Sequence, residues 1–311
     1  MNKETLIQVH NAIKPYIHNT AVMTSKSIDA IAGCNIFFKC ENFQKMGAFK
    51  MRGATYAALQ LSPEQRSKGI VTHSSGNMAQ AVSLAAKSLG IPAYIVMPEN
   101  APQVKKEAVR GYGGIITEVA STVKAREAAA DAIAAEKGAH FIHPSNDIDV
   151  ILGQGTAAYE LLSDHDDLDY ICGPVGGGGL IAGTALNAFH FGNDCKTIGG
   201  EPVNVNDAYR SLEAGMILEN ETTDTVADGL RTHLGDINFP IIQQYVDKII
   251  CVEEDEIISA MRLIWERMKI IIEPSCAVPL AAVLKDKELF KNQKVGIILS
   301  GGNVDLGNLP F

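Results

Sequence analysis

The sequence is poor in the features that mark nucleic-acid-binding, membrane or secreted proteins. Its 311 residues carry 27 basic against 36 acidic side chains, a net charge of -9, so neither nucleic acid nor an anionic membrane is an expected partner. No apolar run approaches the roughly 20 residues that span a bilayer. The N-terminus has helix spacing at Leu6, Val9 and Ile13 and lacks the apolar core of a secretory signal. We therefore expect a cytoplasmic protein.

Cysteine is also scarce, and its spacing excludes a metal centre or disulfide framework of the usual kinds. The chain has six cysteines, with no CxxC pair among them, and several lie in apolar runs. We expect reduced, buried thiols. An acidic protein with ordinary hydrophobic content, 46%, is best interpreted as an enzyme acting on a small molecule.

What the sequence does contain is a repeated alternation of apolar strands and helices. This alternation predicts an α/β fold of two parallel-sheet domains, each with three layers in the order αβα. The small domain is expected as an insertion at residues 54–146, and residues 1–53 and 147–311 form the large domain. A helix is predicted over 154–162, and 218–240 is predicted to be loops and short helices. The expected strands are 34–40, 69–73, 93–97, 114–119 and 140–143, then 170–175, 196–200, 249–252 and 295–299.

Lys50 lies where the first strong strand gives way to a helix, in the run NFQKMGAFKMRGA. Phe49 and Met51 give it a partly apolar setting, which lowers the cost of the neutral, nucleophilic amine. Taken alone, such a lysine is more typical of a surface side chain whose stem covers apolar neighbours. Three further loops at strand ends change this balance, because ligands of parallel sheets bind where strands end and helices begin.

The first of these loops is GPVGGGGLIAG, residues 173–183, with glycine at positions 176, 177, 178 and 179. Without Cβ atoms the backbone can approach a ligand closely and direct its N–H groups at one anion, at the start of a helix. The pattern predicts a phosphate site. The alternative is a tight loop that needs several left-handed residues.

The other two loops carry small polar side chains. HSSGN places Ser74, Ser75 and Asn77 before a helix, where they can cap it, bind a substrate carboxylate, or do both. LSGGN ends the last strand, and Ser300 there offers a neutral hydroxyl to a ring nitrogen or serves only as a turn residue. A phosphate site, a carboxylate site, a neutral hydroxyl and an amine together suit pyridoxal phosphate and an amino-acid substrate.

A family resemblance supports this combination over nearly the whole chain. It resembles the fold type II pyridoxal phosphate enzymes, whose fold is tryptophan synthase β-like, and specifically the serine racemase and threonine (serine) dehydratase group. Four positions depart from the family's usual residues: Met46, Ala48, Met78 and Ser145. The motifs that carry the resemblance are FQKMGAFKMRGA, HSSGN, GPVGGGGLIAG, EPVNVNDAYRS, TVADGL, WERMKIIIEPSCAV and LSGGNVDL.

The resemblance implies a role for each of these loops. Lys50 would bind the cofactor covalently and then act as base at the substrate Cα, with Phe49 against the ring. Asn77 would contact the 3′-oxygen of the pyridine ring and Ser300 its nitrogen. Ser74, Ser75 and Asn77 would hold the substrate carboxylate. The cofactor phosphate would be held by Gly176, Gly177, Gly178 and Gly179.

Two activities follow from the resemblance. A dehydratase would convert serine, threonine or a related 3-hydroxy amino acid to a 2-oxo acid and ammonia. The alternative is a serine racemase with side dehydratase activity, in which Lys50 and Ser75 work on opposite faces of the substrate. The resemblance also implies a homodimer.

A cation site is predicted in GGEPVNVND. Glu201, the carbonyl of Val205 and Asp207 are oxygen ligands that suit Mg²⁺ or Ca²⁺, and Mn²⁺ is a further candidate. The resembling enzymes bind a divalent cation with this arrangement. The alternative is that Asn206 or Asp207 caps the following helix while Glu201 pairs with a base.

An NAD-dependent oxidoreductase is the remote alternative. Gly177, Gly179 and Ala182 satisfy the dinucleotide pattern GxGxxG/A, and Glu201 follows at about the place of a ribose-binding acid. That pattern is weak alone, and this alternative gives Lys50 and the LSGGN loop no role.

Overall fold

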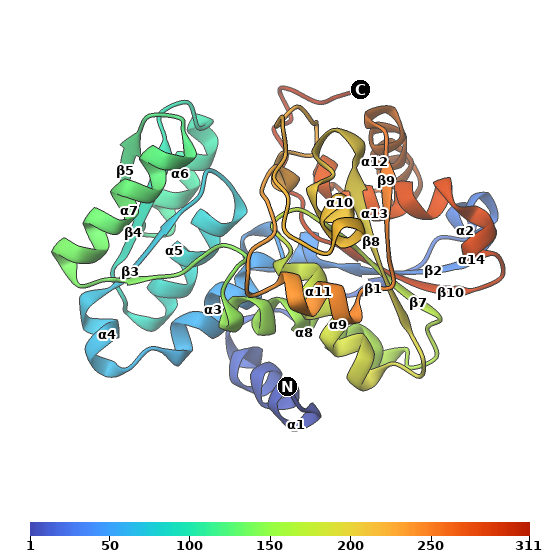
Figure 1. Ribbon diagram of the computed structural model, residues 1–311, viewed down its shortest axis with the longest axis horizontal. Helices are drawn as coiled ribbons and strands as arrows, with labels where there is room; N and C mark the ends of the chain where they lie inside the picture. The colour runs from blue at the N-terminus through green and yellow to red at the C-terminus, as the bar shows by residue number, and fades with distance from the viewer.

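The structure is a computed structural model that describes residues 1–311. Two sheets, each covered by helices on both faces, lie side by side (Figure 1). The larger sheet has six strands in the order β1-β2-β10-β7-β8-β9, and all pair in parallel except β1 with β2. Its strands are β1 (Val22–Met23), β2 (Asn35–Cys40), β7 (Tyr170–Pro174), β8 (Lys196–Pro202), β9 (Lys248–Val252) and β10 (Lys294–Leu299). This confirms the predicted α/β fold.

The smaller sheet has four parallel strands in the order β5-β4-β3-β6. They are β3 (Ile70–His73), β4 (Ala93–Pro98), β5 (Ile115–Val119) and β6 (His140–Phe141), so all fall within the predicted insertion. The domain boundaries themselves stay a prediction, since helix α3 (Lys50–Gln60) runs through the first of them.

The helices bring the chain back from each strand to the start of the next. The small sheet is covered by α5 (Asn77–Leu89), α6 (Gln103–Gly111) and α7 (Val123–Lys137), and the short helix α4 (Pro63–Lys68) lies in the connection from α3 to β3 (Figure 1). The rest of the chain has α1 (Lys3–Ile13), α2 (Lys26–Ala32), α8 (Ile148–Asp164), α9 (Gly179–Phe191), α10 (Asp207–Ala214), α11 (Phe239–Tyr245), α12 (Glu254–Met268), α13 (Pro274–Lys285) and α14 (Lys287–Phe290). Short 3-10 turns are η1 (Lys14–Tyr16), η2 (Glu41–Phe43), η3 (Lys45–Gly47), η4 (Val203–Val205) and η5 (Asp228–Leu230).

Two elements differ from the sequence prediction. Helix α8 begins at Ile148, well before the expected Gln154, because Asp147 caps it by accepting the amides of Asp149 and Val150 at 2.8 and 3.3 Å. Strand β6 covers only the first half of the expected strand 140–143. All six cysteines are unpaired and only Cys251 is partly exposed, as expected for thiols that pack as small apolar groups.

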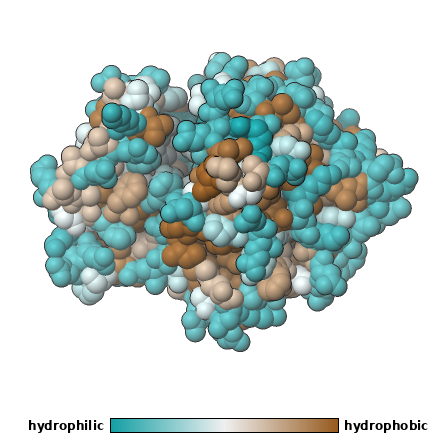
Figure 2. Space-filling model, in the orientation of Figure 1, coloured by the Kyte–Doolittle hydropathy of each residue, from teal (hydrophilic) through white to brown (hydrophobic).

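Hydrophilic residues cover most of the face seen in Figure 2, and hydrophobic ones gather near its middle. A recess on this face separates the part that holds the small sheet from the rest (Figure 2). Across the two parts, Lys105 of α6 donates to Asp228 of η5 at 2.8 Å. No helix has the length and apolar character that crossing a membrane requires.

Candidate active site

Lys50 is the first residue of α3, and the residues just before it lie along the LSGGN loop. Ala48 forms an isolated antiparallel bridge with Gly301. The Phe49 amide donates to the carbonyl of Ser300 at 3.0 Å, and the Gly302 amide donates to the carbonyl of Gly47 at 2.9 Å. Because β2 and β10 are neighbours in parallel, their carboxyl ends bring these two predicted loops together.

The Lys50 amine has no carboxylate partner. Its Nζ donates to the backbone carbonyl of Pro144 at 2.6 Å and lies 5.0 Å from the centre of the Phe49 ring. Burial lowers the pKa of Lys50 to about 8, although the carboxylate of Glu273 raises it. A lysine in this setting supplies a neutral amine near physiological pH, which is what a nucleophile or base requires.

The glycine loop between β7 and α9 has no room for side chains. A Cβ at Gly176 would lie 2.7 Å from the Leu230 Cα, and one at Gly177 would lie 2.4 Å from the Ser145 hydroxyl. Gly178 adopts a left-handed φ of 80°. The amides of 176–179 donate to no acceptor in the chain. Four free N–H groups at the start of a helix, on a backbone that any Cβ would obstruct, fit the phosphate of the expected cofactor.

Two buried side chains that were not predicted from the sequence lie against this loop. Asn238 is fully buried, donates to the carbonyls of Gly177 and Ser145 at 2.9 and 3.3 Å, and accepts the Gly235 amide at 3.1 Å. Gln154 is also fully buried, and its Oε1 has no hydrogen-bond partner although it faces Gly179. An unpaired polar atom at this depth suits a site that is completed by a ligand.

The HSSGN loop connects β3 to α5, with Gly76 as the N-cap residue instead of a serine. Ser74 accepts the Gly76 amide at 3.2 Å. The hydroxyl of Ser75 makes no hydrogen bond within the chain, and both serines are partly buried. Neither serine caps α5, which leaves the Ser75 hydroxyl and the first amides of α5 available to a carboxylate.

Asn77 starts α5 and contacts an acid that the sequence analysis left without a role. Its Nδ2 lies 2.9 and 3.1 Å from the two carboxylate oxygens of Glu273. Burial and the charge of Asp228 raise the pKa of Glu273 to about 7, against hydrogen bonds from Asn77 and the Asn303 backbone. Glu273 lies within the family motif WERMKIIIEPSCAV, but its contact with Asn77 was not predicted.

Ser300 directly follows β10 and is buried, with 2% of its surface exposed. Its backbone carbonyl holds Phe49, and Phe49 is also buried against the apolar cluster beside α8. Ser300, Phe49 and Lys50 therefore converge at the carboxyl ends of β2 and β10. Asn77 also lies near them. It bonds to Glu273, and Glu273 packs against Gly301, where an added Cβ would lie 2.8 Å from the Glu273 carboxylate.

The predicted cation ligands lie at the start of α10. Glu201 is fully buried and accepts the amides of Ala208 and Tyr209 at 2.9 and 2.8 Å, so Glu201 caps this helix instead of Asn206 or Asp207. Asp207 is fully buried and accepts from Asn220 at 2.6 Å. Burial and the charge of Asp207 raise the pKa of Glu201 to about 8.

Two buried carboxylates with no basic partner fit an added cation. No group of three or more His, Cys, Asp or Glu side chains has metal-binding geometry, so such a site would need carbonyl or water ligands, as the predicted Val205 carbonyl would provide. Glu201 is fully buried and caps α10, so it is not exposed at the strand end as a ribose-binding acid would be, which argues against the dinucleotide alternative.

Arg52, two residues after Lys50, lies in a closed network of charges. It makes two hydrogen bonds to Glu41 and two to Glu160, all between 2.7 and 2.9 Å. Lys39 also donates to Glu160 at 2.7 Å. Arg52 and Lys39 are fully buried, and each carboxylate is paired, so the network is neutral. It connects the start of α3 to β2, η2 and α8.

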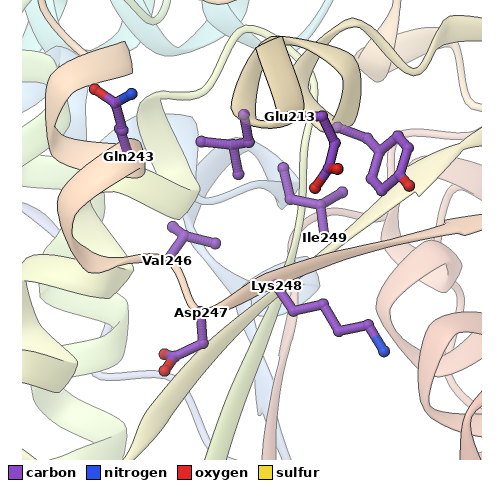
Figure 3. Close-up of a pocket in the computed structure, with 8 residues that line it drawn as sticks. Glu213, Gln243, Val246, Asp247, Lys248 and Ile249 are labelled. Atoms are coloured by element: carbon purple, nitrogen blue, oxygen red, sulfur yellow. The ribbon is translucent and has the colours of Figure 1, made fainter. Parts of the chain in front are cut away.

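A surface cavity of about 370 Å³ lies away from these residues, between α10, α11 and β9 (Figure 3). Glu213, Gln243 and Lys248 border it, and the side chain of Lys248 extends away from Gln243 (Figure 3). It contains none of the predicted site residues and no unpaired buried polar atom.

Comparison with known proteins agrees with the geometry around Lys50. Residues 13–301 match the family described as "Pyridoxal-phosphate dependent enzyme". The chain is 46% identical over 308 residues to a beta-hydroxyaspartate dehydratase of Paracoccus denitrificans, covering 99% of this chain and 98% of the relative. It is 48% identical to a serine racemase of Dictyostelium discoideum, covering 97% and 94%. The structure of maize serine racemase superposes with a TM-score of 0.96 at 46% identity, covering 98% and 94%. This chain belongs to the pyridoxal-phosphate dependent enzymes of fold type II, in the serine racemase and threonine dehydratase group.

Proposed function

We propose that the protein is a dehydratase that converts a 3-hydroxy amino acid to a 2-oxo acid and ammonia. The observation that carries the proposal is the Lys50 amine, which has no carboxylate partner and a pKa lowered to about 8, at the meeting point of the predicted loops. The resemblance to a beta-hydroxyaspartate dehydratase over almost the full length of both chains supports this reaction. Serine, threonine and 3-hydroxyaspartate are the candidate substrates.

In this proposal the cofactor is held by residues from both sides of the site. The amides of Gly176, Gly177, Gly178 and Gly179 bind the phosphate, for which their free N–H groups and the start of α9 are suited. Phe49 lies against the ring, Asn77 donates to the 3′-oxygen and Ser300 faces the ring nitrogen. A neutral hydroxyl at that nitrogen does not force it to be charged. When bound, pyridoxal phosphate supplies an electron sink for the bond that breaks at Cα.

The chain's own groups then move the protons. Ser74, Ser75 and Asn77, with the first amides of α5, hold the substrate carboxylate and so fix the Cα–H bond relative to Lys50. The Lys50 amine removes that proton, and the β-hydroxyl leaves with a proton as water. Addition of water and release of ammonia complete the conversion to the 2-oxo acid. A positioned base contributes typically about 10² to 10⁴ to such a rate.

Serine racemase activity is the second candidate. It needs a proton carrier on the face opposite Lys50, and the Ser75 hydroxyl, which makes no hydrogen bond within the chain, is the proposed group. The 48% identity to a serine racemase of Dictyostelium discoideum supports this activity.

We further propose that Glu201, Asp207 and the Val205 carbonyl bind a divalent cation, Mg²⁺, Ca²⁺ or Mn²⁺, which would neutralise the buried carboxylate pair. The expected homodimer and the cytoplasmic location stay predictions.

One assay separates the candidate activities. The purified protein, supplied with pyridoxal phosphate, is incubated with L-serine, L-threonine and 3-hydroxyaspartate, and both 2-oxo acid and D-isomer are measured. Formation of oxo acid without D-isomer supports the dehydratase. The matched variant Ser75→Ala is expected to lose D-isomer formation and retain oxo acid production from L-substrates, whereas unchanged D-isomer formation would remove Ser75 from the mechanism. A protein that stays colourless with pyridoxal phosphate and produces neither compound would refute the proposed function.

A further inference from the structure

A chain of hydrogen bonds links Asn77 to residues on two sides of the site. The side-chain Nδ2 of Asn303 donates to the carbonyl of Met46 and to Oδ1 of Asn77, both at 2.8 Å. Nδ2 of Asn77 in turn donates to the Glu273 carboxylate at 2.9 and 3.1 Å. The four residues come from η3, the C-terminal loop, α5 and the segment before α13.

The groups at the two ends of this hydrogen-bond series, the Met46 carbonyl and Glu273, determine how both asparagine amides are oriented. A backbone carbonyl can only accept, so Asn303 must turn its NH₂ group toward Met46. That NH₂ group also faces Asn77, which must therefore present its oxygen. At the other end the Glu273 carboxylate takes the NH₂ of Asn77, and in its ionised form it too can only accept. Rotating the Asn77 amide by 180° would set its NH₂ group against that of Asn303 and, when Glu273 is ionised, its oxygen against the carboxylate.

The turn at Met46 is shaped for this arrangement. Met46 has a left-handed φ of 58°, which is uncommon for a residue other than glycine and costs on the order of 1 kcal/mol or more. Gly47 follows with φ 78°, and a Cβ there would lie 2.8 Å from Oδ1 of Asn303. The strained turn thus points a carbonyl at Asn303, and the glycine gives that side chain room to reach it.

We propose that Asn303 and Glu273 are positioning residues that hold the Asn77 amide with a free N–H directed at the bound cofactor. The proposal rests on the proposed function, in which Asn77 contacts the cofactor's 3′-oxygen. Both Glu273 oxygens lie close to one nitrogen, an arrangement that a single N–H satisfies, so the second N–H of Asn77 remains available. If the amide were reversed, an oxygen would face the cofactor's oxygen.

Reversing the chain of hydrogen bonds tests the idea. In Asn303→Asp the side chain can only accept, so Asn77 turns its NH₂ toward it and presents its oxygen to Glu273. Adding Glu273→Gln supplies a donor for that oxygen, so in the double variant both ends of the Asn77 amide are paired again in the opposite direction, and only the Met46 carbonyl stays without a donor. Asn303→Ala removes the donors without adding a charge and serves if Asn303→Asp fails to fold. Asn308→Asp is the control, because Asn308 is exposed on the same C-terminal loop.

The readouts are the melting temperature of the apoprotein, the dissociation constant for pyridoxal phosphate and the visible absorption of the loaded protein. We expect Asn303→Asp to lower the melting temperature and the double variant to recover part of that loss. In both, and in Asn303→Ala, the dissociation constant should rise about tenfold or more and the absorption maximum should shift, as expected for one lost hydrogen bond to a charged oxygen. Glu273→Gln alone should change the dissociation constant by less than about threefold, because its amide can turn to accept from Asn77.

The positioning role would be overturned if Asn303→Asp and Asn303→Ala bound pyridoxal phosphate with wild-type affinity and absorption and differed only in melting temperature. So would a double variant that recovers affinity as well as stability. Failure of the proposed function looks different: the wild type and Asn308→Asp would themselves not bind pyridoxal phosphate.

Discussion

Gly53 of α3 and Gly153 of α8 are in direct contact, and a Cβ added at Gly153 would lie 2.7 Å from the Cα of Gly53. A Cβ at Gly53 would in turn lie 2.7 Å from the carbonyl of Val150. The two helices can approach this closely only because both residues lack a side chain. α3 leads the chain toward the small sheet and α8 brings it back, so this contact holds Lys50, at the start of α3, next to both parts of the molecule.

The pKa of Lys50 predicts how cofactor loading depends on pH. Because burial lowers this pKa to about 8, the neutral amine that attacks the cofactor should increase about tenfold per pH unit up to pH 8 and then level off. The rate at which visible absorbance develops when apoprotein is mixed with pyridoxal phosphate measures this. Borohydride reduction should then place the cofactor on Lys50. Lys50→Ala should give no reduced peptide, while Lys45→Ala in the same segment should behave as wild type; a pH-independent rate, or label on another lysine, would contradict the prediction.

The glycine loop predicts a sharp difference between two glycine substitutions. Gly177→Ala places its Cβ 2.4 Å from the Ser145 hydroxyl and 2.9 Å from that of Thr232, so the loop must move. We expect a loss of about 1 to 3 kcal/mol in stability and at least about tenfold weaker binding of pyridoxal phosphate. Gly111→Ala, at the end of α6 where no atom lies within 4 Å of the new Cβ, is the control. Equal binding by the two variants, measured by fluorescence titration, would mean that the loop does not hold the phosphate.

The carboxylate pair predicts a pH-dependent effect of divalent cations. The pKa of Glu201 is raised to about 8, above its unfolded value of 4.5. The contribution of Glu201 to folding stability is therefore fully present below pH 4.5 and is lost as the pH rises through 8. Mg²⁺ or Ca²⁺ should therefore raise the melting temperature more at pH 8 than at pH 6. Glu201→Gln should abolish this difference, and Glu213→Gln, exposed on the same helix α10, should retain it. A shift of equal size in Glu201→Gln would place the cation elsewhere.

Removal of Arg52 should be among the most destabilising single changes in the chain. Arg52→Met leaves Glu41 and Glu160 buried with only Lys39 as a nearby cation, and breaking such a pair costs about 3 to 5 kcal/mol. Arg262→Met, which breaks only the exposed pair with Glu266, should cost less than about 1 kcal/mol. Urea unfolding of both variants compares them; similar midpoints would show that the buried network contributes little.

The parts of the site that depend on neighbours in sequence were predictable. Lys50 at a strand end, the glycines at 176–179 and Ser300 after the last strand all depend on local patterns, and parallel strands bring their ends together. Likewise, the boundaries of α7 and α10 follow from their end residues, since Gly138 and Gly215 both adopt left-handed φ after the last turn.

The residues that were missed act across long stretches of the chain. Glu273 contacts Asn77 from 196 positions away, and Asn238 reaches Gly177 from 61 positions away, so no local pattern assigns their partners. The start of α8 was missed because Gly153 and Gly155 weaken the helical pattern. Their close contacts with α3 and α9 compensate, and those contacts exist only in the folded chain.

The buried network around Arg52 also sets an order of assembly during synthesis. Lys39, Glu41 and Arg52 emerge from the ribosome before the small sheet, whereas Glu160 emerges after it. Until then the nascent chain has two cations and one acid to bury, which opposes closure of this region. The small sheet is thus synthesised before the N-terminal segment can finish packing. Translation of α8 then supplies the negative charge of Glu160, which allows Lys39 and Arg52 to be buried and the N-terminal segment to pack against α8.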